Sequence, residues 1–76
     1  MSGLSIDMKA TSDNMRSLMQ KNNVSTRELS NRLGISFQAV HKYIHGLTLP
    51  SILHLYMIAK MLGTTMDKLI VVRKDC

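Results

Sequence analysis

Apart from Tyr43, which follows the apolar spacing of the segment, four side chains between residues 38 and 45 can hydrogen-bond or carry charge. Gln38 and Lys42 lie four residues apart, as do His41 and His45, so a helix would carry all four on neighbouring positions of its surface. Glutamine can bind adenine bidentately, and lysine can bind guanine or phosphate. The set therefore has the chemistry needed to contact base edges in a DNA groove, whereas its other interpretation is an ordinary solvated helix face.

The same histidine spacing could hold a metal ion, but no cysteine or acidic residue nearby completes a set of ligands. We therefore expect no metal and no other cofactor. His41 and His45 are instead expected to approach DNA. His54, in a later segment, is expected to have a structural role.

Two short helices joined by a tight turn are predicted to position these side chains. Ser25 and Glu28 have the spacing of a capping box that begins one helix, and Gly34 is typical of the residue that ends it. Ser36 is expected to cap the next helix, and Gly46 to end it. This pattern predicts a helix-turn-helix, in which the first helix braces the second so that it can enter the major groove.

Three more helices are predicted around this pair, because apolar residues recur at spacings of three and four. Their expected extents are residues 12–22, 52–62 and 66–70. The residues expected to cap them are Thr11 or Ser12, then Ser51, then Thr64 or Thr65. The segment before the first helix is expected to be a loose arm or a short strand. The β-branched residues at the end of the last helix are expected to continue as an extended tail.

The composition favours one small basic domain. The chain has 76 residues and a formal net charge of +5, and it contains no Asp or Glu between residues 29 and 66. A surface without acidic residues suits a polyanionic partner, since Lys and Arg gain affinity by displacing counterions from phosphate. A lone cysteine, Cys76, precludes an internal disulfide but could cross-link two chains. With no apolar run of about 18 residues, we expect a cytoplasmic protein with no membrane partner.

The chain resembles the Cro/repressor (XRE-type) helix-turn-helix family over roughly residues 14–70. The residues that carry the resemblance are Ser25, Thr26, Glu28, Leu29, Ser30, Leu33, Gly34, Ile35, Ser36, Val40, Tyr43, Gly46, Pro50, Ser51, Leu55, Ile58, Ala59, Leu62, Gly63, Asp67 and Leu69. The resemblance implies an all-α fold, a compact five-helix bundle like that of lambda repressor, with flexible or strand-like tails. The expected organisation is an N-terminal arm at residues 1–11, the helix-turn-helix domain at residues 12–70 and a C-terminal tail at residues 71–76.

The resemblance and the charge pattern together indicate which residues contact DNA. The expected contacts are Thr26, Arg27, Ser36, Phe37, Gln38, His41, Lys42 and His45. Lys21, Arg16 and Arg32 are further candidates for phosphate contacts. Phe37 is unusual, because the family commonly has a polar residue there; it could touch a thymine methyl group, act as a hydrophobic staple or core residue, or belong to a protein interface.

A second departure from the family pattern concerns a buried ion pair. Family members often have Arg late in the first helix opposite Glu late in the recognition helix, whereas this chain has Met19 and Ile44 at those positions. We expect a hydrophobic contact to replace the ion pair, which can be neutral or stabilising because no charges need to be desolvated.

The favoured function is a sequence-specific regulator of transcription, a repressor that binds double-stranded DNA as a homodimer, with residues 66–72 as a candidate dimer surface. The alternative is a modulator or anti-repressor that uses the same scaffold to bind another regulatory protein. No nucleophile and base fall together in the sequence, so we do not expect an enzyme.

Overall fold

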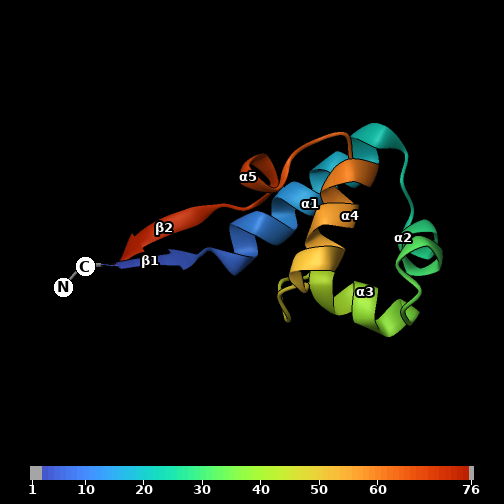
Figure 1. The fold of residues 1–76 in the computed structure, drawn as a ribbon, viewed down its shortest axis with the longest axis horizontal. Coiled ribbons are helices and arrows are strands. Elements are labelled where there is room, and N and C mark those ends of the chain that lie inside the picture. The colour runs from blue at the N-terminus through green and yellow to red at the C-terminus, as the bar shows by residue number, and fades with distance from the viewer. Residues whose placement is uncertain (1–2, 76) are drawn as a thin grey trace.

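The computed structural model describes residues 3–75 and arranges them as a helical bundle with a two-stranded ribbon extending from one end (Figure 1). The helices are α1 Met8–Asn22, α2 Thr26–Leu33, α3 Phe37–Ile44, α4 Ile52–Met61 and α5 Met66–Leu69. The strands are β1 Gly3–Ile6 and β2 Val72–Asp75. The expected five helices are confirmed, but all-α is too narrow a description. Residues 1–2 of the expected arm, and Cys76 with its expected thiol chemistry, lie outside the described residues.

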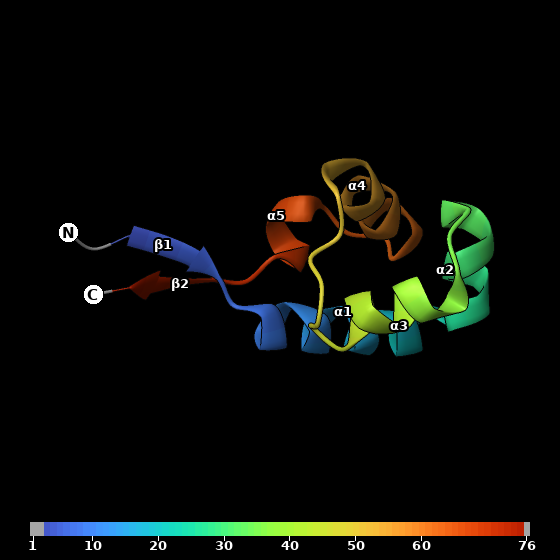
Figure 2. The same ribbon diagram turned by 90° about the horizontal axis from the view of Figure 1, so that it is seen from below.

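The ribbon joins the two ends of the chain. β1 and β2 are antiparallel, with Ile6 paired with Val72 and Leu4 with Lys74. Both termini lie at its outer end, away from the helices (Figures 1 and 2). At its base the Asp7 amide donates to the Val71 carbonyl oxygen at 2.8 Å. The prediction of strand-like tails is confirmed, and the pairing between them, which the sequence left open, is antiparallel.

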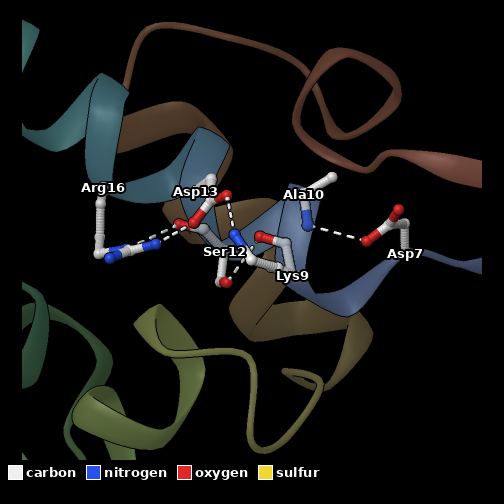
Figure 3. Close-up of polar contacts among 6 residues, drawn as sticks. All are labelled: Asp7, Lys9, Ala10, Ser12, Asp13 and Arg16. Atoms are coloured by element: carbon white, nitrogen blue, oxygen red, sulfur yellow. Dashed lines mark hydrogen bonds and ion pairs between the residues drawn. The ribbon is translucent and has the colours of Figure 1, made fainter.

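The start of α1 differs from the prediction. The helix begins at Met8 because the Asp7 carboxylate accepts the Ala10 amide at 2.9 Å and so caps the first turn (Figure 3). Thr11 and Ser12, the expected caps, are instead buried inside the helix. Their hydroxyls still bind backbone: Thr11 Oγ1 accepts the Val71 amide at 2.9 Å, and the Ser12 hydroxyl donates to the Lys9 carbonyl oxygen at 2.9 Å. The expected cap was wrong because Asp7 supplies an equivalent oxygen one turn earlier.

A small charge cluster covers the outer surface of α1. Asp13 accepts from Lys9 Nζ at 3.1 Å and also pairs with the Arg16 guanidinium (Figure 3). The hydrogen bond from Lys9, with the positive charges of Lys9 and Arg16, lowers the pKa of Asp13 below its ordinary value of 3.8. Arg16 is therefore held by its own helix, which weakens its candidacy for phosphate contact.

The remaining helix caps follow the sequence closely. Side-chain oxygens cap α2, α3, α4 and α5, each accepting an amide three residues on; they belong to Ser25, Ser36, Ser51 and Thr65. The capping box at Ser25 is only half formed. Ser25 Oγ accepts the Glu28 amide at 3.0 Å, but within residues 3–75 no bond returns from the Glu28 side chain to the Ser25 amide. Glu28 remains exposed.

One hydrophobic core joins all five helices. It consists of Met15, Met19, Leu29, Leu33, Val40, Ile44, Leu55, Ile58, Ala59, Leu62 and Leu69. Met19 and Ile44 are each only 7% exposed, so the two positions that carry an ion pair in many family members are buried and apolar here. In the described part of the chain, no helix has the length and apolar character needed to span a membrane.

Candidate nucleic-acid interface

The turn between α2 and α3 is fixed by backbone conformation and by one serine. Gly34 ends α2 with a φ of 68°, a left-handed conformation that glycine adopts without steric cost. Its amide donates to the Ser30 carbonyl oxygen at 2.9 Å, while the Ser30 hydroxyl donates to the Ile35 carbonyl oxygen at 2.7 Å. These bonds hold the chain as it leaves α2, so the direction in which α3 begins is constrained.

The inner side of α3 is anchored in the bundle. Val40 is fully buried and Ile44 nearly so. Tyr43 is half-buried, and its hydroxyl forms a 3.0 Å hydrogen bond with Nδ1 of His54 on α4. The structural role expected for His54 is therefore confirmed, and it consists of joining α3 to α4.

The end of α3 packs closely against the start of α1. Gly46 has a φ of 72°, and a Cβ added there would lie 3.0 Å from both the Met8 carbonyl oxygen and the Ser12 hydroxyl oxygen. A side chain at this position would crowd both oxygens, and the left-handed φ also favours glycine. The helix is consequently held at both ends and along its inner side.

The outer side of α3 is open to solvent. Six of the expected contact residues are exposed there: Ser36, Phe37, Gln38, His41, Lys42 and His45. Phe37 is 54% exposed, which excludes the core position from the alternatives left open by the sequence, while contact with a thymine methyl group or with another protein stays open. A helix anchored from behind with polar side chains in front has the arrangement that base recognition requires.

A shallow hollow of about 320 Å³ lies beside these side chains. It is lined by Ser36, Gln38, Ala39, Lys42, Tyr43 and Thr48. Thr48, which lies in the connection between α3 and α4, is not among the contact residues expected from the sequence. The available clue was a hydroxyl residue two positions beyond the glycine that ends α3. Its amide lies within 3.4 Å of the Lys42 carbonyl oxygen, which folds the loop back beside the helix.

The two histidines lie against each other. The ring centroids of His41 and His45 are 4.2 Å apart, with the rings tilted by 45°. No group of three or more His, Cys, Asp or Glu side chains suitable for a metal occurs among residues 3–75. Both rings are exposed, so hydrogen-bond donors and acceptors of a ligand can reach them.

Thr26 and Arg27 occupy a separate position. They form the first turn of α2, where Thr26 is half-buried and Arg27 exposed, and neither lines the hollow beside α3. Lys21, one of the further candidates for phosphate contact, is exposed in the last turn of α1. The structure thus brings six of the eight expected residues onto α3 and its cap residues, and leaves two on the preceding helix.

Comparison with known proteins agrees with this arrangement. A family model described as helix-turn-helix matches residues 15–69, which run from the middle of α1 to the end of α5. No curated protein and no solved structure matches the chain significantly.

Proposed function

Because the chain belongs to the helix-turn-helix family of the Cro/repressor (XRE) type, we propose that it is a sequence-specific regulator of transcription that inserts α3 into the major groove of double-stranded DNA. We further propose that it represses, by occupying an operator as a homodimer. The observation that carries the proposal is the outer side of α3, where polar and basic side chains are exposed on a helix fixed from behind.

The side chains are assigned different roles by their chemistry. Gln38 is proposed to pair with adenine, because its amide NH₂ group can donate to adenine N7 while its carbonyl oxygen accepts from the N6 amino group. Lys42 is proposed to bind guanine or phosphate as a positive charge. Ser36, Phe37, His41 and His45 complete the proposed groove contacts, with Thr26 and Arg27 on the flanking phosphates.

Charge supports the same orientation. No acidic residue occurs from α3 through α4, and the only formal charge on α3 is that of Lys42. A duplex approaching this side would meet no carboxylate on either helix. Each lysine or arginine that reaches a phosphate releases counterions, so binding should weaken steeply as salt is added.

The test is fluorescence anisotropy with DNA selected from random sequences, measured at several salt concentrations. We expect Gln38→Ala to lower discrimination at one base position by about 1 to 3 kcal/mol. If Lys42 binds phosphate, Lys42→Ala should weaken binding to all sequences. It should also reduce the slope of the logarithm of the binding constant against the logarithm of the salt concentration by about one. Lys74→Ala, which removes an exposed lysine from the ribbon that extends away from the helices (Figure 1), is the charge-matched control.

The second candidate function is a modulator that binds another regulatory protein. Phe37 favours it, because a phenylalanine that is 54% exposed at the start of α3 is unusual on a surface used only for polar contacts. Selection that enriches no DNA sequence, together with an absent or salt-insensitive shift, would support this function and overturn the proposed one.

A further inference from the structure

Phe37 differs in chemistry from every other exposed residue on the outer side of α3. Between residues 36 and 45, all of which the structure describes, it is the only exposed side chain without a polar group. Its phenyl ring is surrounded along the helix by a hydroxyl, an amide, two imidazoles and an ammonium group. A single apolar side chain in such a setting suits a ligand with one small apolar group better than a broad apolar surface.

The other large exposed apolar side chains of the helical bundle lie away from Phe37. Leu47, Leu49, Ile52 and Leu53 follow the opposite end of α3, where the chain leads into α4 (Figures 1 and 2). The two ends of α3 are about 10 Å apart, at about 1.5 Å per residue. A protein interface ordinarily has a contiguous apolar centre, and Phe37 stands at the far end of α3 from this group. Its position therefore favours a contact with DNA over a contact with another protein.

The start of α3 directs the ring toward the proposed groove. The Ser36 hydroxyl accepts the Ala39 amide at 3.1 Å, and the Ser36 carbonyl oxygen accepts the Val40 amide at 3.2 Å. These bonds fix Phe37 in the first turn. Because the Cα–Cβ bonds of an α-helix tilt toward its N-terminus, the ring is directed toward the end of α3 that meets base edges in a helix-turn-helix.

Phe37 and Gln38 lead two rows of side chains on this side of the helix. His41 and His45 follow Phe37 at intervals of four residues, and Lys42 follows Gln38 at the same interval. The leading pair combines an apolar ring with an amide. In the major groove an A·T pair presents N6 and N7 of adenine, which an amide can bind, and the C5-methyl group of thymine, which an apolar side chain can contact. A G·C pair has no methyl group there.

The ring can recognise the methyl group but not the base that carries it. Phenylalanine has no hydrogen-bond donor or acceptor in its side chain, so it does not distinguish the O4 atom of thymine from the N4 amino group of cytosine. It gains affinity by removing apolar surface from water. Thymine and 5-methylcytosine carry the same methyl group on the same ring carbon, whereas uracil and cytosine carry only hydrogen.

We propose that Phe37 recognises a C5-methyl group on one pyrimidine of the site that α3 contacts, and that thymine and 5-methylcytosine satisfy it equally. The inference rests on the proposed function, in which α3 enters the major groove. It assigns a role to the residue that departs from the polar side chain common in the family. It also makes binding responsive to DNA modification, because methylation of a cytosine at this position would tighten the complex.

The first experiment removes the methyl group alone. The DNA is the sequence enriched by selection, and each thymine of one half-site, the part of the operator contacted by one copy, is replaced in turn by deoxyuridine. For one thymine we expect the dissociation constant measured by fluorescence anisotropy to rise about 4-fold, which corresponds to about 0.8 kcal/mol for one buried carbon group. In Phe37→Ser the same replacement should leave the dissociation constant nearly unchanged.

Leu4→Ser is the matched control. Leu4 is 72% exposed and lies on the ribbon, which extends away from the helices (Figure 1). This variant should keep both the original affinity and the full effect of deoxyuridine. Each variant is compared on thymine and deoxyuridine DNA, so a general weakening of binding by Phe37→Ser cancels from the ratio. Circular dichroism checks that both variants fold.

The second experiment adds the methyl group to a different base. Cytosine or 5-methylcytosine is placed at the thymine identified in the first experiment, and binding is measured at low salt, where it is strongest. The original chain should bind the methylated DNA about 4-fold more tightly, and Phe37→Ser should bind both equally. Equal binding of the two DNAs by the original chain would overturn the proposed recognition of 5-methylcytosine.

Several results would overturn the proposal and leave the proposed function standing. They are selected DNA without a thymine in the half-site, no thymine whose replacement weakens binding, and a deoxyuridine effect as large in Phe37→Ser as in the original chain. Phe37→Ser that binds every DNA like the original chain would also overturn it and would assign Phe37 to a contact with another protein. Selection that enriches no DNA sequence would instead overturn the proposed function, and this inference with it.

Discussion

Replacing Ile44 by glutamate tests the packing that holds α3 in place. Ile44 is 7% exposed and belongs to the same core as Met19, so Ile44→Glu would bury a carboxylate with no positive partner. Leaving one charge of a buried pair without its partner costs about 3 to 5 kcal/mol. A domain of this size is stable by about 4 to 11 kcal/mol, at about 0.05 to 0.15 kcal/mol per residue. The substitution should therefore remove a large part of the free energy of unfolding.

The measurement is urea and thermal unfolding followed by circular dichroism. At about 4 to 8 °C per kcal/mol for a domain of this length, the midpoint should fall by at least about 12 °C. Phe37→Glu is the control, because it introduces the same side chain on the same helix at a position that is 54% exposed. Its expected cost is below about 1 kcal/mol.

Two further results would identify the buried charge as the cause. Burial raises the pKa of the introduced Glu above its unfolded value of about 4.3, so the loss of stability should shrink as the pH falls toward and below that value. Adding Met19→Arg to Ile44→Glu should recover part of the loss by supplying the missing charge. An Ile44→Glu variant that melts like the original chain, or a double variant that is less stable than the single one, would refute the reasoning.

The remaining predictions concern the closure of the bundle and the charge cluster on α1. Gly46→Ala should lower the free energy of unfolding by about 1 to 3 kcal/mol, because φ is 72° and the new Cβ would lie 3.0 Å from the Met8 carbonyl oxygen. Gly3→Ala is the control, because nothing lies within 4 Å of its added Cβ, and it should change the free energy of unfolding little. If urea titrations gave the same loss for Gly46→Ala and Gly3→Ala, the close approach at Gly46 would not matter for stability. Asp13→Asn should remove a contribution that is present above the ordinary pKa of 3.8 and is lost as the pH falls through the lowered pKa of the folded state. If the free energy of unfolding fell with decreasing pH equally steeply in the original chain and in Asp13→Asn, that contribution would be excluded.

The helix-turn-helix could be predicted from the sequence because its determinants are local. Ser25, Gly34 and Ser36 act on the backbone within five residues of themselves, and the structure uses each as expected. The ribbon could not be predicted in the same way. Its pairs, such as Ile6 with Val72, join residues more than sixty positions apart, and neither strand has a turn beside it that would indicate its partner. Asp7 was overlooked as a cap because its role depends on where β1 ends.

The outer side of α4 shows a different limit of prediction. The apolar spacing of residues 52–62 correctly indicated a helix, but apolar residues on more than one side of it do not reveal which side meets the core. Ile52 and Leu53 belong to the same apolar sequence pattern as the buried Leu55 and Ile58, yet both are exposed. Only the positions of the neighbouring helices determine which of these apolar side chains are covered.

The anchoring of α3 connects the packing to the proposed recognition. A bidentate contact from Gln38 needs both amide groups placed correctly at once, so any rocking of α3 would weaken discrimination more than overall affinity. Three independent restraints oppose such rocking: the Ser30 bond to the turn, the Tyr43 bond to His54, and the close approach at Gly46. Phosphate contacts from Lys42 or Arg27 tolerate more movement because a single charge has little directional requirement. Loosening one restraint, as in Tyr43→Phe, should therefore reduce the ratio of specific to non-specific DNA binding while leaving the salt dependence unchanged.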